Sequence, residues 1–329
     1  MRKLKIKRES WPIEGAFTIA RGSKTTADVL VVEIEQDNHV GRGECVPYTR
    51  YGESLDKTTA EIKSVQKAIE QGMGRDTLQN ELSASAARNA LDCALWDLEA
   101  KLGRTTVAAL ANLQAIEKEV TTAFTISLDA PEIMQKKAGE NKHRPLLKLK
   151  LTGQGDLARC EAVRRGAPNS SLIVDANEGW DVDTYTRLAP KLAAMGVEGI
   201  EQPLPQGHDD ILSTLPHPVP LIADESCHDR ASLAALKGRY EVVNIKLDKT
   251  GGLTEAIALK REAEAMGFEI MIGCMLATSL AMAPALLLTR NARFIDLDGP
   301  LLLKKDRPEG LVFKESTIVT AKATLWGLQ

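Results

Sequence analysis

The chain has 329 residues, of which 43% are hydrophobic and 26% are charged, and its net charge is −3. These values are ordinary for a globular protein, and the length accommodates one barrel of typical size with a smaller domain. A slightly acidic chain without a basic block gives no reason to expect a nucleic-acid partner. The five scattered cysteines and the lack of an apolar leader predict a cytoplasmic protein with reduced thiols.

The sequence of residues 1–115 predicts an α+β domain. Two strand-like segments flank Gln36-Asp37-Asn38-His39, a turn sequence that indicates a β-hairpin. A helix with an apolar face is expected to begin at Ser83 or Ser85 and to end near Gly103. The two expected strands are residues 29–34 and 40–46.

Residues 116–310 alternate between strand-like and helix-like segments. Eight short apolar segments recur about every 25 residues, which is the length of one strand and one helix. This spacing predicts a parallel α/β barrel, whose active site lies where the carboxyl ends of the strands meet. Residues 311–329 are expected to return to the first domain. The expected strands are residues 121–127, 145–151, 171–175, 197–201, 220–224, 241–247, 269–274 and 293–297.

An uncharged stretch at residues 270–289 is long enough to raise the question of a membrane span. Gly273, Ser279 and Pro284 interrupt it, however, and it falls in phase with the barrel period. We therefore interpret it as a buried strand followed by a buried helix, and we expect no membrane association.

Three acidic residues, Asp175, Glu201 and Asp224, directly follow or end consecutive expected strands. One such acid would be explained better as a loop residue or a helix cap, but three in succession indicate a site. Carboxylate oxygens in this number suit Mg²⁺, which we expect as one ion per subunit. The lack of neighbouring His or Cys argues against zinc.

Three lysines lie on either side of these acids along the chain. Lys148 and Lys150 are two residues apart on one expected strand, so their side chains share a face. Both faces of a parallel barrel strand are buried, so inward lysines need a partner or a function. Lys246 follows four strands later and should face the same space from the opposite side. We expect repulsion between the clustered ammonium groups of Lys148 and Lys150, near a divalent cation, to lower their pKa values and make a usable base. Two bases on opposite faces of one carbon would invert that carbon.

The segment Gly153-Gln154-Gly155-Asp156-Leu157-Ala158 imitates a dinucleotide-binding fingerprint after a strand. A Rossmann fold would leave Glu201, Asp224 and Lys246 unexplained, and the preceding strand carries two lysines on one face. We therefore reject this interpretation.

These residues, in this order, resemble the enolase superfamily, in its muconate-lactonising subgroup with a Lys-x-Lys motif, and above all its dipeptide epimerases. Members of this superfamily use a Lys or His base together with Mg²⁺. The resemblance covers nearly the whole chain and implies a (β/α)7β TIM-like barrel, an N-terminal α+β capping domain and a homo-oligomer. Further matching stretches are residues 87–98, 237–240, 244–252, 273–275 and Asp296-Leu297-Asp298-Gly299-Pro300.

The resemblance implies a role for each candidate residue. Lys150 and Lys246 would be the two bases, and Lys148 would hold the substrate carboxylate and tune Lys150. The other implied roles are metal ligands for Asp175, Glu201 and Asp224, binding of a substrate α-ammonium by Asp296 and Asp298, contact with a glutamate side chain by Arg21, and lining of the pocket by Thr125, Cys274 and Met275. The alternatives are a solvated strand end for Asp296 and Asp298, and a surface residue for Arg21.

The implied activity is inversion of the Glu α-carbon of L-Ala-D/L-Glu by two-base 1,1-proton transfer through an enediolate, in the recycling of murein peptides. Epimerisation of other dipeptides is an alternative, as is a cycloisomerase or dehydratase reaction of the same superfamily. The acids at 296 and 298 argue against substrates that lack a cation. A non-catalytic metal-binding scaffold is a third possibility, against which the intact lysines argue.

Overall fold

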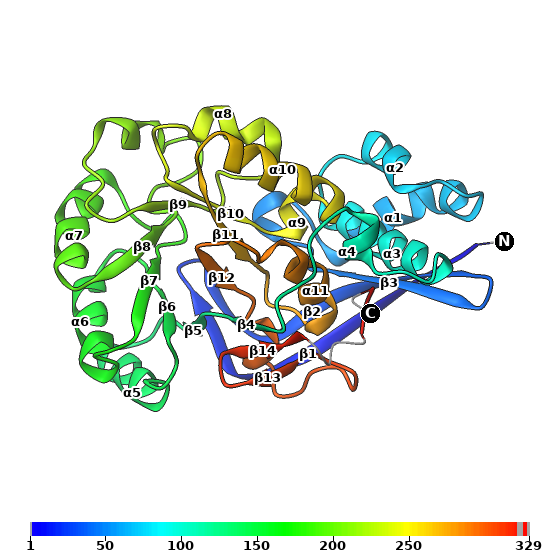
Figure 1. Ribbon diagram of the computed structural model, residues 1–329. Coiled ribbons are helices and arrows are strands. Elements are labelled where there is room, and N and C mark those ends of the chain that lie inside the picture. The colour runs from blue at the N-terminus through cyan, green and yellow to red at the C-terminus, as the bar shows by residue number, and fades with distance from the viewer. Residues whose placement is uncertain (1, 321–324, 328–329) are drawn as a thin grey trace.

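The computed structural model describes residues 2–320 and 325–327 (Figure 1). An antiparallel sheet of β1 (Lys3–Ile19), β2 (Gly22–Gln36) and β3 (His39–Cys45) begins the chain. The predicted hairpin is confirmed, because β2 pairs with β3 and both Asp37 and Asn38 have positive φ, as a two-residue hairpin turn requires. The long strand β1 was not predicted, because few of its side chains are buried and no apolar alternation marks it.

Helices α1 (Leu55–Glu70), α2 (Arg75–Glu81), α3 (Ala86–Leu102) and α4 (Val107–Leu110) follow, after a 3-10 turn at η1 (Thr49–Tyr51). Helix α3 begins after Ser85, whose side chain caps it, and ends before Gly103, as predicted. It is buried almost all round because it lies between the first sheet and the barrel. A Cβ at Gly43 would lie 2.1 Å from the Ala90 carbonyl oxygen, so only glycine allows α3 to pack this closely on β3.

The eight predicted barrel strands are confirmed as one parallel sheet in sequence order. The barrel is nearly closed, and Ala123 N donates a 2.8 Å hydrogen bond to Ile295 O where its two ends meet. The strands are β5 (Phe124–Ile126), β6 (Leu146–Lys150), β7 (Ser171–Asp175), β8 (Val197–Glu201), β9 (Leu221–Ala223), β10 (Val242–Ile245), β11 (Glu269–Gly273) and β12 (Phe294–Asp296). The connecting helices are α5 (Pro131–Glu140), α6 (Asp156–Gly166), α7 (Val182–Ala194), α8 (Leu233–Leu236), α9 (Leu247–Thr250), α10 (Leu253–Ala265) and α11 (Ser279–Ala285), with 3-10 turns at η2 (Asp210–Thr214), η3 (Arg230–Ser232), η4 (Leu286–Leu288) and η5 (Gly299–Leu302).

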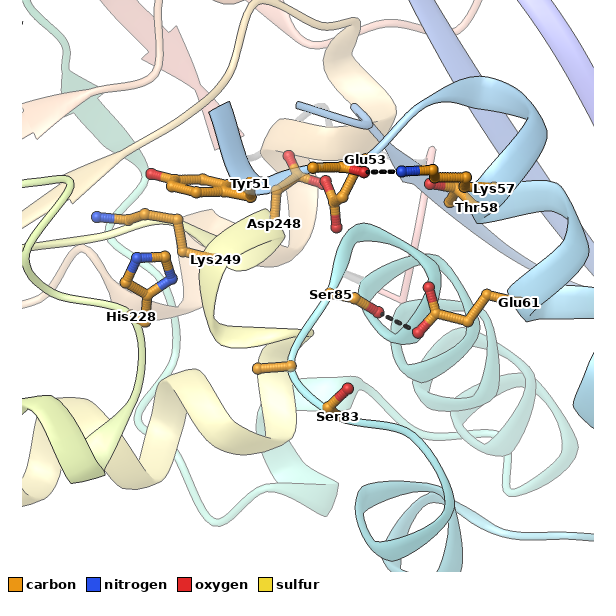
Figure 2. Close-up of a pocket in the computed structure, with 12 residues that line it drawn as sticks. Tyr51, Glu53, Lys57, Thr58, Glu61, Ser83, Ser85, His228, Asp248 and Lys249 are labelled. Atoms are coloured by element: carbon orange, nitrogen blue, oxygen red, sulfur yellow. Dashed lines mark hydrogen bonds between the residues drawn. The ribbon is translucent and has the colours of Figure 1, made fainter. Parts of the chain in front are cut away.

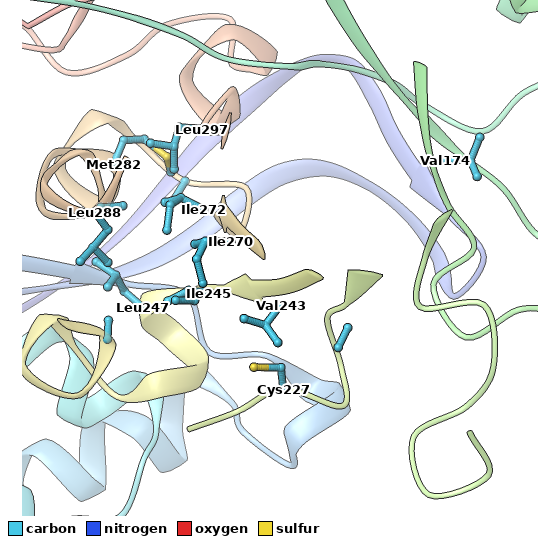
Figure 3. Close-up of a cluster of buried hydrophobic side chains, with 14 of the residues drawn as sticks. Val174, Cys227, Val243, Ile245, Leu247, Ile270, Ile272, Met282, Leu288 and Leu297 are labelled. Carbon is cyan, nitrogen blue, oxygen red and sulfur yellow. The ribbon is translucent and has the colours of Figure 1, made fainter. Parts of the chain in front are cut away.

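Side chains of the barrel strands alternate between its interior and its helices. The outward set is apolar, and Figure 3 shows Ile272 of this set near Met282 and Leu288, and Val243 near Cys227. The inward set begins with an apolar floor at the amino-terminal ends of the strands. The floor consists of Ile173, Ile222, Val242, Met271 and Phe294. The next inward positions on the same strands are therefore the ones that face the carboxyl-terminal rim.

The expected strand 121–127 is in fact two strands that belong to different sheets. Its first part is β4 (Glu119–Thr121), which pairs with β14 (Thr317–Val319) in a small sheet that also contains β13 (Val312–Lys314). Its second part is barrel strand β5. Strands of three residues are too short to show a period, so the sequence does not reveal this sheet.

The segment 311–329 was expected to return to the first domain, and its residues 321–324 and 328–329 lie outside the described part of the chain. Trp326 Nε1 donates to the backbone oxygens of Arg42 and Cys93, at 2.9 and 3.1 Å. Gly327 N donates to Asp97 Oδ1 at 2.9 Å. These residues therefore lie against β3 and α3.

The uncharged stretch 270–289 forms the buried strand β11 and the buried helix α11, as predicted. Within the described residues, we find no helix with the length and apolarity needed to cross a membrane.

A buried polar contact joins the first domain to the barrel at α9. The Asp248 carboxylate is buried and accepts hydrogen bonds from Val46 N at 3.1 Å and Asn89 Nδ2 at 2.8 Å. Burial raises its pKa to about 7, while the two donors partly oppose this. This interface acid should therefore make the stability of the fold depend on pH.

The natural protein should lose stability as pH rises because Asp248 becomes ionised. Asp248→Asn should not show this loss. The folded-state pKa lies above the unfolded value of about 3.9, so the folded protein binds this proton more tightly. The resulting stabilisation is complete below about pH 4 and is lost as pH rises through about 7. We expect the melting temperature of the variant minus that of the natural protein to be larger at pH 8 than at pH 5. Asp76→Asn, at an exposed acid on α2, is the control. A difference that does not change with pH would contradict the assignment.

Candidate active site

The inward residues above the apolar floor form a polar ring at the carboxyl ends of the strands. Register aligns Lys150 with Asp175 and Asp175 with Glu201, so these side chains point to the same side of the sheet. Thr125 is aligned with Lys148, and Gly273 with Asp296. The ring consists of Thr125, Lys148, Lys150, Asp175, Glu201, Asp224, Asn244, Lys246, Asp296 and Asp298, each buried. The structure therefore brings the predicted acids and lysines together.

Each lysine that was predicted to be a base contacts a different carboxylate. Lys150 Nζ lies 2.6 Å from Asp175 Oδ2, and Lys246 Nζ lies 2.6 Å from Asp224 Oδ2. In the strand order, β6 and β10 are four positions apart in a barrel of eight. The two ammonium groups therefore approach the ring from opposite sides.

Lys148 lies between the two lysines, at the centre of the carboxylates. Its Nζ is 2.6 Å from Glu201 Oε2, 2.7 Å from Asp296 Oδ2 and 3.5 Å from Asp175 Oδ2. Burial acts to lower its pKa, but these carboxylates together raise it well above its usual value. The pKa of Lys246 is likewise raised, because Asp224 and Glu201 outweigh burial. The predicted lowering concerned Lys148 and Lys150 beside a divalent cation; the shift at Lys148 has the opposite direction here because its ammonium faces carboxylates more closely than it faces another ammonium.

The three predicted metal ligands are each turned toward lysines. Burial favours a raised pKa at Asp224, yet Lys246 and Lys249 hold this pKa well below its usual range. Glu201 lies between like charges, and burial together with Asp175 raises its pKa. Within the described residues, no three Asp, Glu, His or Cys side chains form a cluster that is ready to hold a metal. The reason is that each carboxylate pairs with an ammonium instead of turning toward its neighbours.

The chemistry of the site nevertheless fits a hard cation. Among the residues that the structure describes, five buried side-chain oxygens lack a hydrogen-bond donor, and all of them lie at this rim. They are Asn177 Oδ1, Glu201 Oε2, Glu225 Oε2, Asn244 Oδ1 and Asp296 Oδ1. Glu201 Oε2 is also close to Lys148, but without the geometry of a hydrogen bond. Unpaired buried oxygens are costly unless a cation or a donor reaches them, and oxygen-only ligand sets suit Mg²⁺.

A cavity of about 580 Å³ opens above the ring, between the barrel rim and the β1–β2 hairpin. Of the twelve residues predicted for the site, six line this cavity and six do not. Those that line it are Arg21, Lys150, Asp224, Lys246, Cys274 and Met275. Those that lie beneath its lining are Thr125, Lys148, Asp175, Glu201, Asp296 and Asp298.

Asp296 and Asp298 are engaged by protein groups below the cavity. Asp296 Oδ2 accepts a hydrogen bond from Lys148 Nζ, and Asp298 Oδ2 accepts one from Thr125 N, both at 2.7 Å. Burial, followed by the nearby Asp296, raises the pKa of Asp298. They are therefore not the solvated strand end that was the alternative, and a substrate cation would have to reach them past the lining.

Arg21, at the tip of the β1–β2 hairpin, is held by the barrel rim. Its guanidinium donates to Glu225 Oε1 at 2.6 Å, Asn177 O at 2.8 Å and Glu178 Oε2 at 3.1 Å. It also donates to the Tyr48 hydroxyl at 2.8 Å. Arg21 is thus more than a surface residue, because it fastens the hairpin over the cavity. These bonds use the N–H groups of the two Nη atoms and leave Nε–H for a substrate side chain.

Several polar residues of the site were not assigned a role from the sequence. Asn244 Nδ2 donates to Glu201 Oε1 at 2.9 Å, and Gln202 Oε1 accepts from Asp224 N and Ser226 N, each at 3.0 Å. The two-residue period of β10 could have revealed Asn244, which is two positions before Lys246. No comparable signal marks Lys249, which lies beyond the strand in α9.

In the segment that imitates a dinucleotide fingerprint, backbone amides bind a side chain of the segment itself. The Asp156 carboxylate accepts hydrogen bonds from Thr152 N, Gly153 N and Trp180 Nε1. The amides that would bind a pyrophosphate are therefore already used. The rejection of a Rossmann fold is confirmed by the barrel, in which successive strands are neighbours throughout.

A parallel barrel with a separate N-terminal sheet, and with lysines on both sides of a carboxylate ring, defines an enzyme of the enolase superfamily. Residues 1–111 match the N-terminal domain of the mandelate racemase / muconate lactonizing enzyme family, and residues 132–319 match the enolase C-terminal domain-like family. The chain therefore belongs to the mandelate racemase / muconate lactonizing enzyme family. The predicted superfamily and fold class are confirmed.

Two relatives share nearly half of their sequence with this chain. It is 48% identical over 315 residues to the L-Ala-D/L-Glu epimerase of Escherichia coli, covering 95% of this chain and 98% of that protein. It is 46% identical over 301 residues to an N-acetyl-D-glutamate racemase of a Pseudoalteromonas species, covering 91% and 95%. The prediction of an isomerase similar to the dipeptide epimerases is confirmed.

Solved structures agree with these relatives. An enolase family member from Agrobacterium tumefaciens with homology to dipeptide epimerases, containing sodium and L-Ala-L-Glu, has a TM-score of 0.96. It is 48% identical, and the match covers 99% of this chain and 100% of that one. A dipeptide epimerase from Enterococcus faecalis, complexed with Mg and L-Leu-L-Tyr, has a TM-score of 0.90 at 30% identity, covering 99% and 98%.

Proposed function

We propose that this protein is a Mg²⁺-dependent epimerase that inverts the Glu α-carbon of L-Ala-D/L-Glu by two-base 1,1-proton transfer. The observation that carries the proposal is the placement of Lys150 and Lys246 on opposite sides of one carboxylate ring, both lining the same cavity. The similarity to the Escherichia coli enzyme supports the choice of substrate.

The site residues divide the chemistry between them. Asp175, Glu201 and Asp224 would hold Mg²⁺, which would take up the carboxylate charge that raises the lysine pKa values and would polarise the substrate carboxylate. One of Lys150 and Lys246 accepts the α-proton as a neutral amine, and the other donates a proton to the opposite face as an ammonium. Lys148, between them, stabilises the negative charge of the enediolate as it develops.

The substrate and its surroundings limit the outcome to proton return. The α-nitrogen of a dipeptide is an amide, which is a poor leaving group, so elimination does not compete. The hairpin that Arg21 fastens to the rim covers the cavity and limits access of water to the intermediate. The net result is inversion of the carbon.

Charge in the cavity supports an acidic substrate. Five basic side chains line it against three acidic ones, Asp28, Asp224 and Glu225; the basic ones are Arg21, Lys24, Arg50, Lys150 and Lys246. A dipeptide with a glutamate at its second position carries two carboxylates, which such a lining attracts. The experiment that tests the proposal is incubation of a small dipeptide panel with the protein and Mg²⁺ in D₂O, with Cα deuteration followed by NMR. If no dipeptide gains deuterium, the proposal is wrong.

A second candidate function is racemisation of an N-acylated glutamate, the substrate type of the Pseudoalteromonas relative. The observation that favours it is the engagement of Asp296 by Lys148 and of Asp298 by Thr125, which leaves neither acid on the cavity lining. A substrate without an ammonium group needs no such acid. Comparison of free and N-acetylated substrates separates the two functions.

Free L-Ala-L-Glu should be turned over with a higher kcat/KM than N-acetyl-L-Ala-L-Glu, because acetylation removes the charge that Asp296 and Asp298 would bind. Loss of a charge-assisted contact costs about 1.5–3 kcal/mol, or roughly ten- to a hundred-fold in kcat/KM. Asp298→Asn should lower kcat/KM for the free dipeptide by a comparable factor and shrink the preference. If N-acetyl-D-glutamate is instead the better substrate and Asp298→Asn does not affect its turnover, the racemase function replaces the dipeptide one.

Wider expectations follow from the same proposal. We propose one Mg²⁺ per subunit, a cytoplasmic location, a homo-oligomer and a role in murein peptide recycling, with no nucleic-acid or membrane partner. We further propose that residues 1–115 form the capping domain, residues 116–310 the catalytic barrel and residues 311–329 a segment returning to the cap. A separate apolar core that extends from Leu4 to Leu98 supports the first boundary.

A further inference from the structure

Helix α9 is a single turn that begins directly after Lys246. Lys246 is its N-cap residue and lies beyond the last residue of β10, Ile245. Lys150, in contrast, lies within β6 and is aligned with Asp175 of the neighbouring strand. The position of Lys150 is therefore set by the sheet, whereas the position of Lys246 also depends on what holds α9.

Lys249 holds α9 to the barrel. Its side chain is fully buried, and its ammonium donates to Asp224 O at 2.5 Å, Asp224 Oδ1 at 2.6 Å and Asn244 O at 2.9 Å. These bonds use all three of its N–H groups. Strands β9 and β10 are joined by only two aligned residue pairs, so Lys249 ties their carboxyl ends together above the last pair. Because Lys246 contacts Asp224 Oδ2, both oxygens of this carboxylate are held by lysines from the same short segment.

Asp248 and its neighbours hold α9 to the first domain. Asn89 on α3 donates to Asp248, and Arg88 donates to Thr250 O at 2.7 Å and Gly251 O at 3.0 Å. Gly251 has a φ of 68°, and a Cβ there would lie 2.6 Å from Arg88 Nε. The approach of α3 to the end of α9 therefore requires glycine at this position.

A cavity lies beside α9, all four residues of which are buried. Its volume is about 290 Å³, and its lining includes Tyr51, Glu53, His228, Asp248 and Lys249. Figure 2 shows Asp248 and Lys249 leaving α9 in different directions, Asp248 toward Glu53 and Lys249 toward Tyr51 and His228. The polar bonds of α9 to α3 and to Asp224 hold it on the sides that the cavity does not border.

We propose that Lys249 and Asn89 are positioning residues, which hold α9 between the first domain and Asp224 and thereby place Lys246 for proton transfer. This inference rests on the proposed two-base reaction. In this proposal, the packing of α3 on the barrel serves to position Lys246. The two proton-transfer steps then depend on different parts of the structure. The step at Lys150 depends on the sheet, and the step at Lys246 depends on the contact between the domains.

The test compares proton exchange at the two faces of the substrate. Lys150→Ala leaves exchange by Lys246, and Lys246→Ala leaves exchange by Lys150. Adding Lys249→Met to each should reduce the rate of Cα deuteration about tenfold or more in the first background, because small misplacements of a reacting group are costly. In the second background the reduction should stay under about threefold, because the β6 sheet contacts of Lys150 remain. Equal reductions in the two backgrounds, or none in either, would overturn the proposal.

A second measurement does not depend on turnover. Amide hydrogen exchange should become faster in residues 249–252, whose amides donate to Lys246 and Leu247, in both Lys249→Met and Asn89→Ala. If Lys249→Met folds poorly, Asn89→Ala tests the attachment of α9 from the first domain. Trp96→Phe is the matched control, since it removes a bond from α3 to Thr254 on α10 and leaves α9 alone. Unchanged protection of residues 249–252 in Asn89→Ala would overturn the proposal. A lack of Cα deuteration in both single lysine variants, with faster amide exchange as expected, would refute the two-base function and leave the anchoring of α9 supported.

Discussion

Replacing Glu201 with glutamine should abolish epimerisation while the protein stays folded. Glu201 ends β8 at the middle of the three proposed metal ligands, and its carboxylate lies between Lys148 and Asn244. Glutamine keeps the size of the side chain but removes the charge that would bind a divalent cation. Stabilisation of transition-state charge by a metal ion is worth several kcal/mol, so we expect kcat to fall about a thousandfold or more. The measurement is kcat at increasing Mg²⁺ concentration, with the melting temperature recorded for the same samples.

Glu198→Gln is the control for this variant. Glu198 lies on the same strand but is exposed near its amino-terminal end, where it accepts a hydrogen bond from Ser171 Oγ. Its replacement should leave both activity and Mg²⁺ dependence unchanged, because the carboxyl-terminal rim and the amino-terminal face of a barrel have largely separate roles. Full turnover by the natural protein after exhaustive treatment with EDTA would contradict the metal assignment.

Lys150→Ala and Lys246→Ala should each stop epimerisation but preserve exchange of the α-proton of one epimer with solvent. The lysines approach the ring from opposite sides, so the one that remains can remove a proton from its own face and return it there. Return from the far face needs the missing base, and loss of a positioned base costs about 10²–10⁴-fold. The two variants should exchange opposite epimers, which NMR in D₂O measures directly.

Lys191→Ala, on the exposed side of α7, is the control for the loss of a lysine charge and should behave like the natural protein. Epimerisation at close to the normal rate by either active-site variant would mean that one lysine serves both faces. Exchange of the same epimer by both variants would place the two lysines on one side of the substrate.

Much of the fold could be predicted because it depends on local periods. Apolar segments such as residues 172–174 recur at the spacing of a strand and a helix, and their length and the lack of charge within them agree with burial on both faces. The β2–β3 hairpin was marked by its turn residues. Strands β1, β4, β13 and β14 were missed because they are exposed or only three residues long, so that pairing with a distant strand creates them and local sequence does not.

The candidate site was predictable to a similar extent and for a similar reason. Asp175, Glu201 and Asp224 were found from their place at strand ends, and Lys148 and Lys150 from their spacing on one strand. Asn244 and Lys249 were not assigned, because their role depends on which side chains they meet across the ring. The directions of the pKa shifts at Lys148 and Lys246 could not be read from the sequence for the same reason, since they depend on distances to carboxylates that belong to other strands.

The sequence by itself determined that this chain forms a parallel barrel with lysines and acids at one rim, because strand periodicity and strand order together dictate which residues face inward and where strands end. Only the tertiary structure decided which lysine meets which carboxylate, that Arg21 is bound to Glu225, and that Asp298 lies under the cavity lining. These contacts join residues up to 204 positions apart in the chain. Their geometry is set by the packing of the whole barrel against the first domain, which no local pattern encodes.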